Sequence, residues 1–234
     1  MNNPINAIDH DGRVVIFING MHTGVGGRSE YWNGLDNRLM NRFNDRNAIY
    51  RDGAIGGART TWATTLFYYL GGFNKSNLSA RIRTREGRTQ GYQDAEGIFN
   101  KLVDGETIKV ATHSMGGAYG KGYVKGLMKY AKENGIDVTG KIEEVDLAPY
   151  QPGSQQAVNG VPTTVIAHKG DTVAGSDPIQ GANNNVTRQG KEPSGAEHSV
   201  NSFSQEEINS KIPQHSQSSR TGSSTSEQNP RRQE

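Results

Sequence analysis

Short apolar runs typical of buried strands alternate along this chain with a segment whose apolar side chains follow a helical period. Residues 14–18 and 108–112 are rich in β-branched side chains, and residues 142–147 and 161–168 indicate two further strands. Residues 91–105 instead gather their apolar side chains on one helix face: Tyr92, Ala95, Ile98, Phe99 and Leu102. Near-continuous apolar runs are typical of parallel strands that are covered on both faces. We therefore expect an α/β fold whose mostly parallel central sheet is flanked by helices on both faces.

The second apolar run passes directly into a Gly/Ala-rich helical pattern through Thr112-His113-Ser114-Met115-Gly116-Gly117. A serine with small residues two positions before and after it is typical of a tight strand-to-helix turn, which exposes the hydroxyl on a strained backbone. Gly116 meets this requirement, whereas Thr112 meets it only in part. The N–H of Met115 and the positive end of the following helix would face an oxyanion formed beside the serine. We predict Ser114 as a nucleophile and Met115 as an oxyanion donor.

A Gly-rich loop follows the first strand and begins Asn19-Gly20-Met21-His22. A glycine at this place lets the backbone come close to a substrate, so the loop is suited to give a second oxyanion donor. We assign that donor to the N–H of Met21, with His22 as the next choice. Gly20 and His22 are also predicted to contribute to substrate binding.

A serine hydroxyl needs an imidazole to accept its proton and a carboxylate to fix the tautomer of that imidazole. Three of the aspartates that follow the serine lie at or after the ends of predicted strands. Asp171 lies in a Gly-containing turn after the fourth predicted strand, Asp146 ends the strand before it, and Asp177 comes shortly after. We predict Asp171 as the acid, with Asp146 as its main rival and Asp177 as a weaker one.

The two histidines beyond Asp171 differ in their surroundings. His198 lies in the last stretch with apolar neighbours, while His215 lies in a polar tail where nothing would hold its ring. We therefore predict His198 as the base. His113, inside the turn, and His168, at the end of a strand, are expected to pack or to form structural hydrogen bonds.

The residues Asn19-Gly20, Thr112 to Gly117, Asp171 and His198 make the chain resemble a lipase-type α/β-hydrolase over residues 13–205. The resemblance implies the order Ser, Asp, His, with the acid usually after the penultimate strand and in some members after an earlier one. It therefore favours Ser114, Asp171 and His198 as catalytic residues, keeps Asp146 open, and implies chemistry without a cofactor or a metal. The chain departs from the family pattern with Thr112 in place of a glycine and Asn19 in place of a histidine.

A second resemblance covers only residues 1–12. Asn3-Pro4 followed by Asp9-His10-Asp11-Gly12 is similar to the end of an Rhs repeat-associated core, although His10 stands where that motif has proline. The resemblance implies that the following domain is a toxin effector, delivered into competing bacteria on a larger protein and paired with an immunity protein.

Length and composition fit one catalytic domain with polar ends. The 234 residues are enough for one sizeable core. Residues 206–234 are mostly Ser, Gln, Asn, Glu and Arg, and so few apolar side chains cannot offset the entropy of ordering the segment. We divide the chain into an Rhs-core-like linker at 1–12, a hydrolase domain at 13–205 and a disordered tail at 206–234.

The charge balance argues against a nucleic-acid partner. The chain has 26 Lys and Arg against 24 Asp and Glu, and no basic stripe is interleaved with aromatic residues. Its notable basic cluster, Arg81, Arg83, Arg85 and Arg88, is expected to be a solvated face, with contact to a phosphate headgroup or an anionic membrane surface as the sharper alternative. The absence of cysteine excludes disulfide and thiol chemistry. Neither a signal peptide nor a transmembrane segment is predicted, and the location is left open.

The segment richest in aromatic residues spans residues 60–73. It is expected to be a short helix packed on the sheet, or else a lid or acyl pocket beside the serine, with Trp62 as a substrate-binding candidate. Tyr31 and Trp32 are further candidates for the same cleft.

These residues together predict transfer of an acyl group to water by a serine esterase. A lipid or phospholipid ester is the expected substrate if the Rhs resemblance holds. The same three residues also suit an amidase, a peptidase or an acyltransferase. A non-catalytic binding module with the same fold is the remaining alternative, and it is supported by the departures at Thr112 and Asn19.

Overall fold

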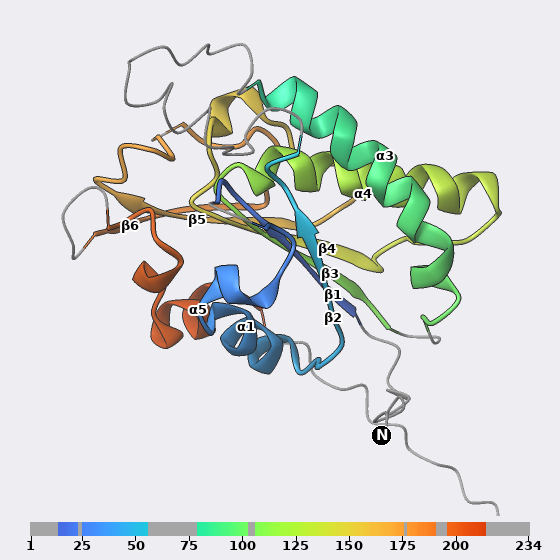
Figure 1. Ribbon diagram of the computed structural model, residues 1–234, viewed down its shortest axis with the longest axis horizontal. Helices are drawn as coiled ribbons and strands as arrows, with labels where there is room; N and C mark the ends of the chain where they lie inside the picture. The colour runs from blue at the N-terminus through green and yellow to red at the C-terminus, as the bar shows by residue number, and fades with distance from the viewer. Residues whose placement is uncertain are drawn as a thin grey trace, which may run out of the picture.

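The computed structural model describes residues 14–22, 25–55, 79–102, 106–175, 177–190 and 196–213, which form one layered α/β unit (Figure 1). The predicted linker at 1–12, the aromatic segment with Trp62, and His215 lie outside the described residues.

A six-stranded sheet in which every strand pair is parallel forms the centre of the molecule, with the order β2-β1-β3-β4-β5-β6. The strands are β1 (Val14–Asn19), β2 (Ala48–Asp52), β3 (Ile108–His113), β4 (Ile142–Leu147), β5 (Thr163–Lys169) and β6 (Asn184–Gln189). The expected α/β fold with a parallel sheet is therefore confirmed.

Helices cover both faces of this sheet (Figure 1). On one face lie α1 (Leu35–Phe43) and α5 (Gln205–Lys211), and on the other lie α3 (Ala80–Phe99) and α4 (Gly116–Glu133). Successive side chains of β1 explain the two cores, because Val15 and Phe17 enter the cluster on the α1 side. Ile16 and Ile18 enter the cluster on the α4 side.

The helix predicted at residues 91–105 begins earlier and ends earlier, since α3 spans Ala80–Phe99. Its first half lacks an apolar stripe because it packs against α4 through glycine. A Cβ atom on Gly91 would overlap the carbonyl of Tyr123, and one on Gly122 would overlap the carbonyl of Thr84. Close backbone contact replaces large side chains here, so the hydrophobic pattern could not locate the start of the helix.

The basic cluster lies on α3 and is divided by burial. Arg81, Arg85 and Arg88 are exposed, in agreement with a solvated face, but Arg83 is fully buried. The Arg83 guanidinium lies 5.6 Å from the ring centroid of Tyr150 and donates to the side-chain carbonyl of Gln151 at 3.3 Å.

The predicted disordered tail starts too early, because residues 206–213 belong to the folded unit. Ser204 caps α5 by accepting from the N–H of Glu207 at 3.2 Å. Ile208 and Ile212 are both buried in the core on the α1 side. Two isoleucines four residues apart are enough to dock one helical turn, although the surrounding composition is polar.

The chain reverses direction across the sheet beside β1. From β1 it passes to β2 on one side and then crosses to β3 on the other, so β1 and β3 flank a topological switch point. Open parallel sheets bind ligands outside the carboxyl ends of the strands at such a point. In this chain those ends carry Gly20 and Ser114. Among the described residues, no helix has both the length and the apolar character that a membrane crossing requires.

Candidate active site

Ser114 occupies the sharp turn between β3 and α4. Its φ of 56° is left-handed, a conformation that a serine adopts only where its surroundings impose it. A Cβ atom on Gly116 would overlap the carbonyl oxygen of Ile18, and one on Gly20 would lie 2.5 Å from the Ser114 Cβ. The glycines therefore let the β1 loop, the serine and the first turn of α4 meet.

Thr112 fits two positions before the serine because its neighbours make room for it. Gly120 on α4 lacks the Cβ that would lie 2.5 Å from the Thr112 methyl group. The Thr112 hydroxyl donates to Oδ1 of Asp146 at 2.5 Å. The expected crowding of the turn is thus relieved by a glycine one turn along the helix.

Asp146 belongs to a buried ionic cluster below the turn. The Lys121 ammonium contacts Oδ2 of Asp146 and lies 2.9 Å from Oε2 of Glu144. Burial opposes a charged Lys121, but the two carboxylates outweigh it and raise the pKa of Lys121. Asp146, the main rival for the acid, is therefore engaged with Thr112 and Lys121, whereas His198 contacts Asp171.

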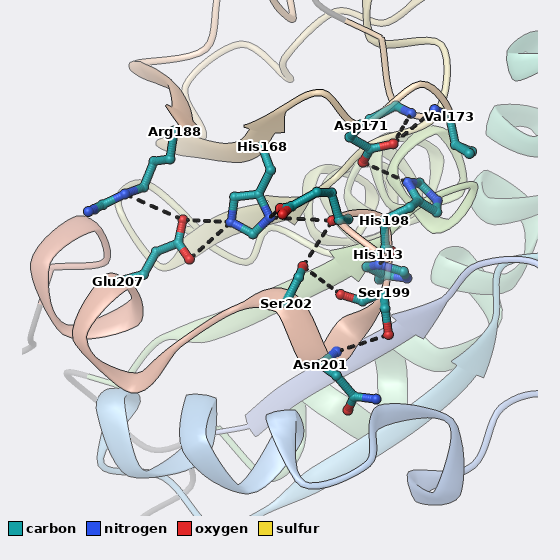
Figure 2. Close-up of polar contacts among 12 residues, drawn as sticks. His113, His168, Asp171, Val173, Arg188, His198, Ser199, Asn201, Ser202 and Glu207 are labelled. Atoms are coloured by element: carbon teal, nitrogen blue, oxygen red, sulfur yellow. Dashed lines mark hydrogen bonds and ion pairs between the residues drawn. The ribbon is translucent and has the colours of Figure 1, made fainter. Parts of the chain in front are cut away.

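The predicted serine, histidine and aspartate are hydrogen bonded in a row. His198 Nε2 lies 2.7 Å from Ser114 Oγ. Figure 2 shows the contact on the other side of the ring, where His198 Nδ1 lies 2.8 Å from Asp171 Oδ2. The other carboxylate oxygen of Asp171 accepts from the N–H groups of Val173 and Ala174, each at 2.9 Å. Burial alone would raise the pKa of Asp171, but its bonds to His198 and to these N–H groups lower it, so the carboxylate stays ionised.

His113 forms a hydrogen bond with the backbone of His198. Its Nε2 donates to the carbonyl oxygen of His198 at 2.9 Å, and its Nδ1 accepts from the hydroxyl of Tyr31 at 2.5 Å. Burial, with the nearby charge of His198, lowers the pKa of His113 to about 3. A neutral ring with one donor and one acceptor satisfies both partners. The expectation of a structural hydrogen bond is confirmed for His113.

The loop after β1 is braced by the buried side chain of Asn19. Its amide Nδ2 donates to the carbonyl of Gly20 and its Oδ1 accepts from the N–H of Gly27, both at 2.7 Å. Because the Gly20–Met21 peptide is trans, a carbonyl held toward Asn19 points the N–H of Met21 away from Asn19. Met21 and Met115, the two predicted oxyanion donors, line the same cleft as Ser114.

His22 does not line that cleft. Its Nε2 lies 3.0 Å from Oδ1 of Asp52 at the end of β2, and both side chains are largely buried. Asp52 also accepts from the N–H of Ala54 at 3.0 Å. The structure therefore places His22 against Asp52 and outside the lining of the cleft, and its role in substrate binding stays a prediction.

The cleft has a volume of about 450 Å³ and is mainly apolar. The residues around it are Met21, Tyr31, His113, Ser114, Met115, Tyr150, Val173, His198, Ser199 and Val200. Met21 and Val173 are 43% and 42% exposed, which is unusual for large apolar side chains in this molecule. Tyr31 was predicted for the cleft and lies there, whereas Trp32 is fully buried against Phe17, with ring centroids 5.0 Å apart.

Sequence reasoning missed Tyr150 and Val173. Tyr150 follows the end of β4 and donates its N–H to the carbonyl of Ser114 at 2.9 Å. Val173 lies in the turn that Asp171 organises. Both residues follow carboxyl ends of parallel strands, and this position in the sequence could have indicated that they line the cleft. Asp177, the weaker rival for the acid, is exposed and packs beside Gly153.

In the part of the chain that the structure describes, no three His, Cys, Asp or Glu side chains are grouped as a metal site. Comparison with protein-family models gives no match, and comparison with curated proteins gives no significant match. The function is therefore inferred from the side chains at the switch point.

Proposed function

We propose that this protein is a serine hydrolase that cleaves carboxylic esters, with the architecture of a lipase-type α/β-hydrolase. The observation that carries the proposal is the hydrogen-bonded row from Ser114 through His198 to Asp171, which begins at a serine with left-handed backbone. Strand order alone does not favour this function, since doubly wound sheets with the same order serve other chemistries.

In the proposed reaction, Ser114 Oγ attacks the ester carbonyl carbon while His198 Nε2 takes the hydroxyl proton. Asp171 keeps the Nδ1 proton on His198 and stabilises the imidazolium that forms. The N–H groups of Met21 and Met115 bind the oxyanion of the tetrahedral intermediate. The intermediate collapses, the C–O bond to the alcohol breaks, and His198 returns its proton to that oxygen.

Water then releases the acyl group from Ser114. His198 takes a proton from the water, the resulting hydroxide attacks the acyl carbonyl, and the Ser114 oxygen leaves with the proton of His198. The acid product departs and the serine is restored.

The apolar wall of the cleft supports an ester with an apolar acyl group. Met21, Val173 and Val200 present hydrocarbon beside the hydroxyl, so a hydrophobic acyl chain would be removed from water next to the nucleophile. The resemblance of residues 1–12 to an Rhs core supports a lipid ester of a target bacterium as the substrate.

A fluorophosphonate probe tests the proposal, because it phosphonylates only a serine whose proton is accepted by a neighbouring base. We expect labelling of the wild-type chain, loss of labelling in Ser114→Ala, and hydrolysis of short p-nitrophenyl esters that disappears with the same substitution. An unlabelled chain that is correctly folded contradicts the proposal. Faster turnover of amide substrates, or acyl transfer to an added alcohol, would instead identify an amidase or an acyltransferase.

A further inference from the structure

His168 lies between the two turns that carry the proposed acid and base. Its carbonyl oxygen accepts from the N–H of Asp171 at 3.1 Å. Its ring Nδ1 lies 3.0 Å from Oε2 of Glu197 and 3.3 Å from the carbonyl oxygen of Glu197, the residue directly before His198. One residue at the end of β5 therefore contacts both segments.

The other side of the ring faces the C-terminal helix. His168 Nε2 lies 3.0 and 3.1 Å from the two carboxylate oxygens of Glu207 on α5. The ring also stacks on Phe203, with centroids 4.8 Å apart. The side chains of His168, Glu197 and Glu207 are each at least nine-tenths buried, so these contacts are largely shielded from solvent.

This geometry favours a charged ring. A neutral imidazole has a single N–H and would turn a lone pair toward one of the carboxylates, whereas an imidazolium donates to both. Burial is the largest influence on this ring and opposes its charge, but the bonds and charges of Glu207 and Glu197 outweigh burial and raise the pKa of His168. Among the residues that the structure describes, the other charged groups facing the cluster are Glu206, which lines the same hollow, and Arg188 on β6, 3.7 Å from Glu207.

We propose that His168 is a positioning residue for His198, and that its imidazolium fastens the His198 segment to β5 and to α5 through Glu197 and Glu207. The proposal rests on the proposed function, since it assigns His198 as the base. His198 is then held in two ways. Asp171 contacts its ring at Nδ1, and His168 and His113 contact the backbone carbonyl groups of residues 197 and 198, respectively.

The two histidines need opposite protonation states. His198 must be neutral to accept the serine proton, while His168 must be charged to hold its two carboxylates. A group whose pKa is raised by folding contributes fully below its unfolded pKa of about 6.5, and loses the contribution as pH rises through the raised value. The reaction rate is therefore expected to fall on the alkaline side, where His168 loses its proton and releases the His198 segment.

The rate at which a fluorophosphonate labels Ser114, measured against pH, tests this positioning role without knowledge of the substrate. His168→Gln is expected to lower the labelling rate by up to about 100-fold, as for small displacements of catalytic groups, and to abolish the alkaline fall. Glu207→Gln removes one of the two carboxylates and is expected to move the alkaline fall to lower pH. Ile208→Ala is the matched control on α5, because it weakens packing in the core without touching an ionic group.

A purely structural role gives a different pattern. In that case Ile208→Ala and Glu207→Gln lower the unfolding temperature and the labelling rate together, and the alkaline fall stays in place. Labelling rates and pH profiles that match wild type in both His168→Gln and Glu207→Gln overturn the positioning role, and if His168→Gln does not fold, Glu207→Gln decides alone.

Absence of labelling in the wild-type chain at every pH overturns the proposed function instead. The ion pair is then judged by NMR titration of the histidine rings. His168 is expected to keep its proton above pH 6.5, and the His198 signals are expected to shift when that proton leaves. His198 signals that ignore the titration of His168 contradict the positioning role.

Discussion

A single side-chain amide, that of Asn19, controls the direction of the peptide group beside Ser114. It holds the carbonyl of Gly20 and the N–H of Gly27 at the two ends of one loop, and it is completely buried. A preorganised donor of this kind accelerates acyl transfer because no rearrangement is needed when charge develops on the oxyanion. In the proposed reaction, Asn19 therefore orients the Met21 donor from the position where the family pattern has a histidine.

Replacement of Asn19 by Ala is expected to lower kcat for ester hydrolysis by about 100-fold, the effect of losing one oxyanion donor, with little change in KM. The Gly20 carbonyl would lose its hydrogen-bond partner, and the Met21 N–H would no longer be held toward the position of the oxyanion. Steady-state kinetics with a p-nitrophenyl ester measure this. An increase in KM at constant kcat would show that the loop binds substrate and does not stabilise the transition state.

The two candidate acids predict opposite results for matched substitutions. Asp171→Asn keeps the size of the side chain but favours the wrong His198 tautomer, so kcat is expected to fall about 10⁴-fold in a folded protein. Asp146→Asn removes one partner of Lys121 in the buried cluster, and its expected effect is a loss of about 3–5 kcal/mol of stability. Kinetics and denaturant unfolding of both variants separate the roles, and loss of turnover in a stable Asp146→Asn variant would reverse the assignment.

At the scale of elements, α3 and α4 pack so closely that their shared face tolerates no added methyl group. Gly91 and Gly122 each face the backbone of the other helix. Because α4 begins at Gly116, two residues after Ser114, the contact between these helices also fixes the first turn of α4 beneath the serine. Helix packing and the geometry of the turn are therefore coupled.

A pair of glycine substitutions within α3 tests this packing. Gly91→Ala is expected to destabilise the protein by about 1–3 kcal/mol or more, since overpacking must move one helix. Gly97→Ala adds the same atom where nothing lies within 4 Å, and it is expected to stabilise the helix by about 0.5–1 kcal/mol. Equal effects of the two substitutions on the denaturant midpoint would contradict the close contact.

The sequence was most informative where structure is decided locally. β1, β3 and the turn at Ser114 follow from adjacent residues, so they could be predicted. The start of α3 depends on contact with α4, and the burial of α5 depends on contact between Ile208 and the core. Neither feature can therefore be predicted from the residues of its own segment. The partners of His168 also come from distant parts of the chain, the loop at Glu197 and helix α5 at Glu207, so sequence reasoning could only expect that this ring would pack or form hydrogen bonds.

At the scale of the whole molecule, the parallel sheet brings together residues that are far apart in the chain. Gly20, Ser114, Tyr150 and Asp171 all follow carboxyl ends of strands, and these ends share one edge. His198 is added from the segment that leads to α5, where His168 and Glu207 fasten it. The proposed active site therefore requires the C-terminal helix as well as the sheet.

Expression in a bacterial host tests the proposed role as a toxin that acts on lipid esters. We expect growth to fall when the intact chain is produced in the compartment where its substrate lies, either the cytosol or the periplasm, because hydrolysis would remove acyl chains from membrane lipids. Ser114→Ala keeps the small side chain and the fold but lacks the nucleophile, so it is expected to be harmless at equal protein levels. Lipid extracts should contain free fatty acids only with the intact chain. A co-purifying protein that blocks probe labelling of Ser114 would identify the immunity partner, whereas normal growth in both compartments would contradict the toxin role and leave the esterase chemistry standing.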